Sequence, residues 1–334
     1  MLVFLVRRLV FGLVAMFLVL SGSFFFWTLH YWPRTPAFPA YLAWLKGFVN
    51  GHSLSTGLLP PPDAVAPGPA HLWQYVCEPF GRTLLLLLVT FVLVVLIAVP
   101  LGTLAAARRD STFDTVLRVT SYAAWTIPAF LVALILQDGL AALSGGWGTD
   151  LFPRAGWAGE CPGGIGLVFD SHRMPHCPSA GTGLTHIGLV LYHLTLPALS
   201  LALGFIGLHA RYLRSALLDT LSEPYIAVAR SKGLSERAVL FRHALRNALV
   251  TFVPVLVSDF GLLLGGSLVV DIIFRLGGLG EMFIDALKLT VEAFVPVDTN
   301  ALQLALLLGA GLMFVMSVLG EVALWFVDPR TRPE

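Results

Sequence analysis

The stretch LSEPYIAVARSKGLSERAVLFRHALRN, Leu221–Asn247, is the longest polar and basic run in an otherwise apolar chain. It predicts two short helices separated at Gly233, because glycine readily adopts the left-handed conformation that ends a helix. Ser222 is the expected N-cap of the first helix, with Pro224 in the opening turn. Ser235 is the expected N-cap of the second helix. We call this stretch the polar hairpin.

The composition of the chain is that of an all-α integral membrane protein. Of 334 residues, 57% are hydrophobic and only 12% are charged, whereas about 25% of the residues in a soluble domain are charged. Segments of about 20 mostly apolar residues are long enough to span a bilayer as helices. Six such spans are predicted: Leu9–Leu29, Thr83–Ala107, Val116–Leu136, Ile187–Leu208, Leu249–Phe274 and Ala301–Val327.

The first span could instead be a cleaved signal peptide. Bulky residues, Phe24 to Trp27, stand where a signal peptide would have small residues for cleavage, so a membrane span is favoured. The chain then divides into an N-terminal transmembrane helix (1–32), an extracytoplasmic loop (33–80) and a five-helix core (81–330). An amphipathic piece, Tyr41–Val49, lies in that loop, and Pro128 lies inside the third span.

The distribution of basic residues predicts the topology. Six spans place both termini on one side of the membrane, and cytoplasmic segments are enriched in Lys and Arg. With cytoplasmic termini, the inside segments hold fourteen of the 21 Lys and Arg residues, although the outside segments are longer. The fourteen are Arg7, Arg8, Arg108, Arg109, Arg118, Arg211, Arg214, Arg230, Lys232, Arg237, Arg242, Arg246, Arg330 and Arg332.

This topology places the polar hairpin in the cytoplasm, within a loop over residues 209–248. A solvated positive-inside loop is one interpretation. The apolar residues on both predicted helices favour a second one, docking of a partner protein, because exposed apolar patches mark interaction sites. The chain has no GxxxxGK[ST] phosphate loop. If transport is driven by ATP, the ATPase is therefore expected on another chain.

Asp259 is the acidic residue expected near the middle of the membrane. It lies about ten residues into the fifth span, or ~15 Å at the helical rise. An acid at that depth must face the interior of a bundle or an aqueous path. It could line a transport pathway, together with Asp271, or it could form a hydrogen bond between helices. A self-contained ion-coupled carrier or channel that uses Asp259 is the alternative function.

Two other kinds of site receive less support from the sequence. Cys161 and Cys177 enclose His172 and His176 in an outer loop, but their spacing matches no zinc signature, so a Cys161–Cys177 disulfide is favoured over a metal site. An intramembrane hydrolase would need a nucleophile beside a base. His193 and Ser200 in the fourth span are seven residues apart and no GxSxG motif is present.

The polar hairpin closely resembles the cytoplasmic signature loop (EAA loop) of permease subunits from the dipeptide, oligopeptide and nickel branch of ABC importers. The segments HLTLPALSLALGFIGLHARYLRSALLDTLSEPYI, LLLGGSLVVDIIFRLGGLGEMFIDAL and ALWFVDPRTR extend the resemblance over about half of the chain. Ala227 takes the position of the signature glutamate, and Thr251 stands where a proline is usual. Pro254 follows shortly after, so the chain is expected to bend there. The residues matched to the ATPase-coupling signature are Ala227, Ala229, Gly233, Leu234, Ser235, Glu236, Arg237, Arg242 and His243.

The resemblance implies a permease of the type I ABC importer fold, with a coupling-helix loop between spans four and five. It implies half of a translocation pathway for short peptides or a related small solute, and no enzymatic activity in this chain. The expected partners are a second homologous permease, two ATPase subunits that bind ATP and Mg²⁺, an extracytoplasmic substrate-binding protein and the lipid bilayer. No nucleic acid and no cofactor or metal in this chain are expected. The expected location is a bacterial or archaeal inner membrane.

Overall fold

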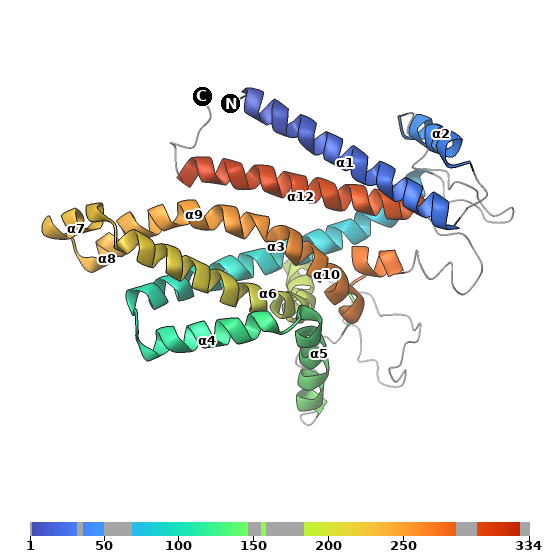
Figure 1. Cartoon of the computed structure of the whole chain (residues 1–334). Coiled ribbons are helices and arrows are strands. Elements are labelled where there is room, and N and C mark those ends of the chain that lie inside the picture. Colours follow the sequence, from blue (N-terminus) through green and yellow to red (C-terminus); the bar gives the residue numbers. More distant parts are fainter. Residues whose placement is uncertain are drawn as a thin grey trace. The chain divides into compact units, whose positions relative to one another are not determined.

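The computed structural model describes residues 2–31, 36–49, 69–145, 155–157, 184–284 and 299–327. Within these ranges the chain is helical, with turns and no strand (Figure 1). The elements are α1 (Leu2–Tyr31), α2 (Ala37–Val49), α3 (Pro69–Ala107), α4 (Thr112–Thr126), α5 (Ala129–Gly145), α6 (Leu184–Leu221), α7 (Pro224–Ser231), α8 (Glu236–Ala238), the π-helix η1 (Val239–Ala244), α9 (Leu245–Ser258), α10 (Phe260–Phe274) and α12 (Thr299–Val327).

The expected all-helical membrane architecture is confirmed. Five continuous helical segments among the described residues are long and apolar enough to cross a bilayer, and a bent pair of helices makes a sixth if it is counted as one span. The segments fall within α1, α3, α6, the α8–α10 run and α12. They coincide with the first, second, fourth, fifth and sixth spans that the sequence predicts.

The third predicted span is not one continuous helix, which corrects the expectation from the sequence. α4 ends at Thr126 and α5 begins at Ala129, with a bend of 95° between them. Pro128 explains the break, because a proline ring disfavours the helical conformation of the residue before it. Ile127 is accordingly extended, with φ −80° and ψ 119°. The proline therefore divides the span instead of kinking it.

The fourth span is longer than predicted. α6 continues past the expected end at residue 208 as far as Leu221. These extra turns carry Arg211 and Arg214, yet they also bury Leu213 and Leu217 completely. Apolar side chains four residues apart share one helix face, and packing on that face stabilises the helix. The start of the predicted cytoplasmic loop is therefore helical, and the polar hairpin begins where α6 ends.

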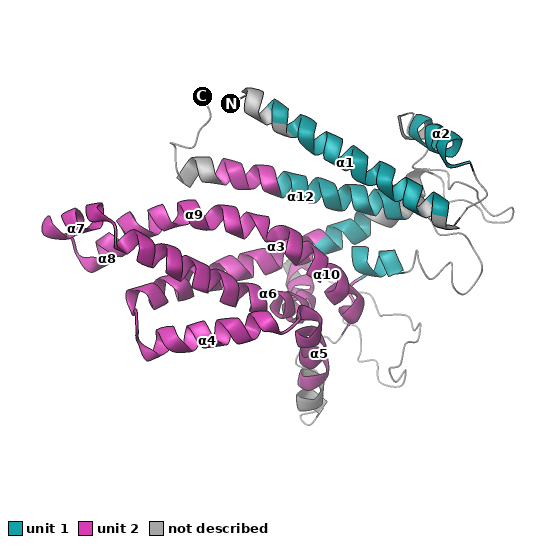
Figure 2. Ribbon diagram, viewed as in Figure 1, with its two compact units in different colours: residues 1–83, 277–316, 333–334 teal, residues 84–276, 317–332 magenta. Residues whose placement is uncertain are grey.

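The structure divides into two compact units, which Figure 2 colours teal (unit 1) and magenta (unit 2). Unit 2 comprises residues 84–276 and 317–332 and includes the polar hairpin. Within it α4 packs closely on α6, because a Cβ atom at Gly207 would lie only 2.9 Å from the Ser121 Cα atom. A core cluster joins α3, α5, α6 and α10 through Leu86, Ala133, Val190, Leu194, Leu196, Ala198, Leu201, Val270, Phe274 and Leu276.

Unit 1 comprises residues 1–83 and 277–316, with two terminal residues. Its best-defined contact is between α1 and α2, where Leu20 and Phe24 bury Trp44. The segment after α10 also contributes, because the backbone N–H of Leu279 donates a 2.9 Å hydrogen bond to Thr83 Oγ1. The amphipathic piece expected in the first loop is thus part of a helix, α2, that packs on the first span.

Candidate functional site

The first arm of the polar hairpin begins one residue later than expected. Glu223 is the N-cap of α7 and Pro224 is its first helical residue, but the Glu223 side chain makes no capping bond. The Ser222 hydroxyl instead donates a 2.6 Å hydrogen bond to the carbonyl oxygen of Asp219. The prediction that Ser222 caps α7 is wrong, because the terminal carbonyls of α6 compete for the hydroxyl.

The turn between the arms has the geometry that the sequence predicts. Gly233 has a φ of +79°, in the left-handed region. Its N–H donates to the Arg230 carbonyl oxygen at 2.9 Å, and the N–H of Leu234 reaches back to the Ala229 carbonyl oxygen at 3.4 Å. Ser235 Oγ accepts a 3.3 Å hydrogen bond from the N–H of Ala238, which confirms the second cap. Both ends of the turn are therefore fixed by local hydrogen bonds.

The second arm runs without a loop into the membrane span. The turns α8, η1 and α9 follow one another directly, and residues Glu236–Phe274 form one helical run of 39 residues. The π-helix at Val239–Ala244 was not foreseen, and π-helical turns often occur at functional sites. Pro254, where the chain was expected to bend, lies inside α9. The helical run is interrupted at Asp259 instead, between α9 and α10.

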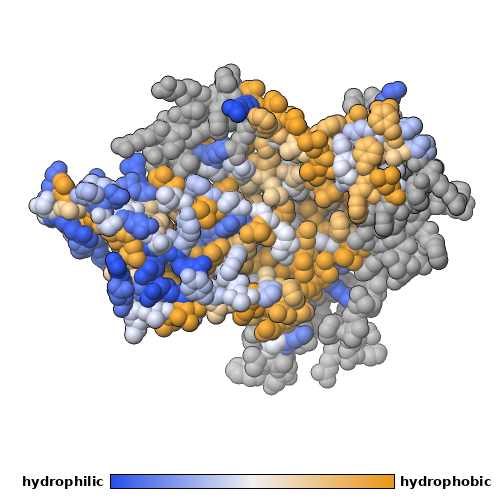
Figure 3. Space-filling view, in the orientation of Figure 1, coloured by the Kyte–Doolittle hydropathy of each residue, from blue (hydrophilic) through white to orange (hydrophobic). Residues whose placement is uncertain are grey.

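The apolar residues of the polar hairpin separate into two sets. Ile226, Val239 and Ala244 are completely buried between the arms and the neighbouring helices. A second set faces outward, with exposed fractions of 40% for Tyr225, 53% for Val228, 40% for Leu234 and 57% for Phe241. Figure 3 shows polar side chains gathered where α7 and α8 lie, with hydrophobic residues interspersed among them. The exposed set is thus an apolar surface framed by charge.

The signature residues also divide by exposure. Ala229 is buried at 8%, so it acts on the packing of the hairpin, and His243 is partly buried. The remaining members are exposed and available for contact: Ala227, Gly233, Leu234, Ser235, Glu236, Arg237 and Arg242.

Two polar contacts hold the hairpin arms together. Arg230 and Glu236 form a two-point ion pair across the turn, with Nε–Oε1 at 2.9 Å and Nη2–Oε2 at 3.2 Å. The hydrogen bond from Arg230 lowers the pKa of Glu236 below its ordinary value. At the base of the hairpin, Asn247 Nδ2 donates to the Tyr225 hydroxyl at 2.5 Å. These contacts add to the backbone hydrogen bonds that define the turn and help to orient the exposed apolar residues.

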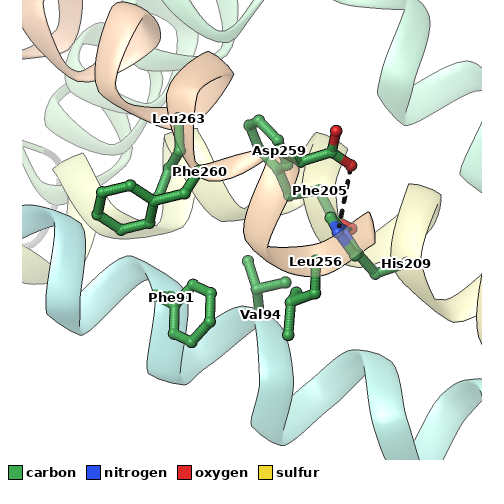
Figure 4. Close-up of a pocket in the computed structure, with 8 residues that line it drawn as sticks. All are labelled: Phe91, Val94, Phe205, His209, Leu256, Asp259, Phe260 and Leu263. Atoms are coloured by element: carbon green, nitrogen blue, oxygen red, sulfur yellow. Dashed lines mark hydrogen bonds and ion pairs between the residues drawn. The ribbon is translucent and has the colours of Figure 1, made fainter. Parts of the chain in front are cut away.

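Asp259 meets a histidine that the sequence reasoning overlooked. His209 on α6 places Nε2 3.4 Å from Asp259 Oδ2, and its Nδ1 lies 2.8 Å from the Phe205 carbonyl oxygen (Figure 4). The His209 side chain is 2% exposed and that of Asp259 is 20% exposed. The contact therefore links α6 to the junction of α9 and α10, which agrees with the packing interpretation of Asp259.

A small cavity adjoins this pair. Six apolar side chains surround it, and it has room for roughly one water molecule. A dipeptide does not fit there in this conformation. The sequence offered little signal for His209, because the predicted fourth span ends at Leu208 and residue 209 fell in the predicted cytoplasmic loop. The apolar lining residues are Phe91, Val94, Phe205, Leu256, Phe260 and Leu263.

A buried ion pair, also missed from the sequence, joins α4 to α6. The Asp114 carboxylate is fully buried and accepts two hydrogen bonds from Arg214, from Nε and, at 2.5 Å, from Nη2. It also accepts the backbone N–H of Asp110 at 3.1 Å, and Arg118 Nε lies 3.9 Å away. Arg214 is seven residues before the end of α6, so the pair braces the helix that leads into the polar hairpin.

Asp271 is not brought near Asp259. It is 1% exposed and twelve residues further along the same helical run, which corresponds to ~18 Å at the helical rise. Cys161, Cys177, His172 and His176 lie outside the described residues. In the ranges that the structure covers, no three His, Cys, Asp or Glu side chains are grouped as metal ligands would be.

His193 and Ser200 do not form a nucleophile and base. His193 Nδ1 lies 2.9 Å from the Gly156 carbonyl oxygen. The Ser200 hydroxyl donates a 2.7 Å hydrogen bond to the Pro197 carbonyl oxygen, one turn back in α6. Both groups therefore make separate structural contacts in the fourth span.

Comparison with known proteins identifies the family. A family model described as "Binding-protein-dependent transport system inner membrane component" matches residues 98–333, more than two thirds of the chain. The chain belongs to this family. The matched residues include α4 to α10 and thus the polar hairpin, the His209–Asp259 contact and the Asp114–Arg214 ion pair. The family consists of permease subunits of ABC transporters, which confirms the resemblance that the hairpin carries.

Individual relatives agree with this assignment. An oligopeptide transport system permease protein of Bacillus subtilis is 32% identical over 299 residues, covering 88% of this chain and 80% of the relative. A putative peptide permease protein of Brucella suis is 30% identical, covering 87% and 79%. A putative peptide transport system permease protein of Brucella abortus is 34% identical, covering 78% and 71%.

A solved structure shares the fold. The crystal structure of an amino acid ABC transporter with histidines aligns with a TM-score of 0.50 over 78% of this chain and 96% of its own. The sequences are 14% identical, so the match concerns the arrangement of helices alone. The chain is therefore a multi-pass inner-membrane permease subunit, and the family assignment favours this reading over a self-contained carrier that uses Asp259.

Proposed function

We propose that this chain forms half of the translocation pathway of an ATP-driven importer for short peptides. The substrate class is supported by the relatives of Bacillus and Brucella, which are described as peptide or oligopeptide permeases. The other half of the pathway is a second, homologous permease. An extracytoplasmic binding protein delivers the peptide, and both termini of the present chain lie in the cytoplasm.

The polar hairpin is the contact for a separate ATPase subunit. The observation that carries this assignment is the outward set Tyr225, Val228, Leu234 and Phe241, which is large and apolar yet 40% or more exposed. An apolar surface of this kind on a short helix suits a groove in a partner protein. The surrounding charges keep the hairpin soluble until the partner binds.

The helical run provides a mechanical path from this contact to the membrane. Because Glu236–Phe274 is helical throughout apart from the turn at Asp259, a displacement of the second arm reaches the fifth span without a flexible loop. The first arm follows α6 directly, and Asp114 braces α6 against α4 through Arg214. ATP and Mg²⁺ bind the partner ATPase subunits, of which the importer has two, and their closure moves the hairpin.

A role of Asp259 and Asp271 in lining the transport pathway remains a prediction. Asp259 is better placed of the two, because its side chain keeps partial exposure at a helix junction, whereas Asp271 is 1% exposed. The His209 contact nevertheless supports a packing role for Asp259. A disulfide between Cys161 and Cys177 likewise stays a prediction.

Substituting Gly233 with alanine tests the hairpin as the coupling element. A left-handed conformation costs an L-residue about 1–2 kcal/mol, and Gly233 has a φ of +79° with no atom within 4 Å of an added Cβ. The methyl group therefore strains the turn without causing a clash. We expect Gly233→Ala to lower ATP-driven peptide uptake by the reconstituted importer roughly tenfold, with weaker co-purification of the ATPase.

Gly265→Ala is the matched control. Gly265 also has no atom within 4 Å of an added Cβ, but it lies inside α10 with no left-handed backbone. The same methyl group at Gly265 should leave uptake and ATPase retention unchanged. If Gly233→Ala retains full uptake while the protein is folded, the hairpin is not the coupling element. Loss of uptake in both variants would point to general damage instead.

A further inference from the structure

The amphipathic helix α2 presents an apolar surface that no described part of the protein covers. Its thirteen residues, AFPAYLAWLKGFV, contain one charged side chain, Lys46, in the last turn. Phe38 and Leu42 are 64% and 46% exposed. They are four residues apart and thus on the same side of the helix. A helix that faced water on that side would carry polar residues there.

The opposite side of α2 is anchored to the first span. The rings of Phe24 and Trp44 are tilted relative to each other with centroids 5.2 Å apart, and the ring centroids of Tyr41 and Phe25 are 5.0 Å apart. The Tyr41 hydroxyl lies 2.9 Å from Ser21 Oγ, within hydrogen-bond distance. Trp44 is 7% exposed as a result. The aromatic contacts and the hydroxyl contact hold α2 at a fixed position along the axis of α1.

That position lies within the membrane. The apolar part of α1 includes Leu9 to Phe26, and the first span predicted from the sequence continues to Leu29, which gives ~31 Å of helix, close to the thickness of the hydrocarbon core. Phe24 and Phe25 belong to the last two turns of this span, and Ser21 lies just before them. Because α2 packs on those turns, it lies at the depth where the hydrocarbon core meets the headgroups. Tyr and Trp are the residues that favour this depth.

We infer that α2 is an interfacial membrane helix whose outer surface binds phospholipid. Phe38 and Leu42 extend the exposed apolar surface of α1, where Leu18 is 63% and Phe26 is 62% exposed. In this arrangement Phe38 and Leu42 contact the acyl chains, and the Lys46 ammonium lies near the lipid phosphates. Helices that lie in the interface combine a buried apolar side with basic residues in this way. The part of the first loop that forms α2 is therefore fixed to the bilayer next to the first span.

Site-specific photocrosslinking distinguishes lipid from a protein partner. The photoreactive amino acid p-benzoylphenylalanine replaces Phe38 or Leu42 in the full importer, reconstituted with its binding protein in nanodiscs of phosphatidylethanolamine and phosphatidylglycerol. On illumination the ketone inserts into a neighbouring C–H bond, and mass spectrometry identifies the adduct. We expect both positions to yield phospholipid adducts at a level within about twofold of a Leu18 variant, which lies in the apolar part of α1.

Val228 supplies the opposite control, because it is apolar and 53% exposed but lies on the polar hairpin. It should give no phospholipid adduct. The inference is overturned if Phe38 and Leu42 crosslink to the binding protein or to the second permease. It is equally overturned if they give no adduct while Leu18 reacts with lipid. The outcome does not depend on the role of the hairpin, because only the Val228 control lies there.

Discussion

Three contacts in unit 2 each bring a carboxylate beside a basic side chain, in different surroundings. Asp114 is 0% exposed and its partner Arg214 is 12% exposed. The Asp259 and His209 side chains are 20% and 2% exposed. Arg230 and Glu236, on the polar hairpin, are 45% and 73% exposed. The geometry of the Arg230–Glu236 pair is nearly as good as that of the Asp114–Arg214 pair, so the main difference between them is access to water.

Access to water decides what each contact can do. A buried charge that loses its partner keeps its desolvation penalty, whereas an exposed charge regains hydration. Asp114 therefore holds α4 on α6, while Glu236 only adjusts the orientation of a turn that backbone hydrogen bonds already define. His209 and Asp259 lie between these cases. The polar hairpin, which we propose as the contact for the ATPase, carries the contact that costs least to break.

Breaking the Asp114–Arg214 pair should have the largest effect. Asp114→Asn removes the charge that compensates Arg214, and we expect a loss of about 3 kcal/mol in the free energy of unfolding, because the loss of one partner of a buried pair costs roughly 3–5 kcal/mol. Arg214 keeps slight exposure, which places the effect at the lower end. Thermal melting of the purified protein in nanodiscs measures the loss.

Asp110→Asn is the control for this substitution. Asp110 adopts a positive φ of 61°, which asparagine tolerates, and its side chain is 74% exposed beside Arg109. Its melting temperature should stay close to that of the unaltered protein. The double variant Asp114→Asn with Arg214→Met should recover part of the stability, because no uncompensated charge remains. Equal melting temperatures for Asp114→Asn and Asp110→Asn would contradict a bracing role.

Breaking the His209–Asp259 contact should have an intermediate effect on stability. His209 Nε2 faces the Asp259 carboxylate at 3.4 Å but has no hydrogen-bond partner among the described residues. In Asp259→Asn the amide can donate a hydrogen bond to this nitrogen, so we expect melting temperature and uptake to change little. Asp259→Leu places an apolar side chain beside the buried nitrogen instead, at a cost of about 1–3 kcal/mol. Comparing the two variants by thermal melting and by peptide uptake separates packing from transport. Uptake lost in Asp259→Asn at an unchanged melting temperature would assign Asp259 to the pathway instead.

Local sequence signals predicted the parts of the fold that depend on local physics. Five spans follow from apolar length, and the Gly233 stop and the Ser235 cap follow from backbone chemistry. The broken third span was missed although Pro128 was noted. A proline in a long apolar segment can either kink or divide the helix, and the packing of both flanking pieces decides which occurs.

The buried pairs were missed for a different reason. Asp114 and Arg214 are a hundred positions apart, and each is an ordinary residue beside other charges in the sequence. Only the close approach of α4 to α6 at Gly207 brings them together, and one sequence carries no direct record of such a contact. Asp259 was recognised because it stands alone in an apolar span, yet its partner depended equally on tertiary structure.

Breaking the Arg230–Glu236 pair should have the smallest effect. The direction of the Glu236 pKa shift predicts the pH range in which the pair stabilises the hairpin. The pKa of Glu236 is lowered in the folded hairpin by the hydrogen bond from Arg230. Its contribution is therefore fully present above the ordinary pKa of glutamate, about 4.3, and is lost as the pH falls through the lower folded value. We expect Glu236→Gln to increase amide exchange in the hairpin by about two- to fivefold at pH 7, in keeping with an exposed pair.

Hydrogen exchange with mass spectrometry over residues 225–240, corrected for intrinsic rates, measures this difference. The two proteins should converge as the pH falls through the lowered pKa of Glu236, because Glu236 then becomes protonated and resembles glutamine. Arg237→Gln is the matched control: Arg237 is exposed in the same turn, and its variant should show no such convergence. A Glu236→Gln effect as large as that of Asp114→Asn would mean that solvent access does not set the strength of these contacts.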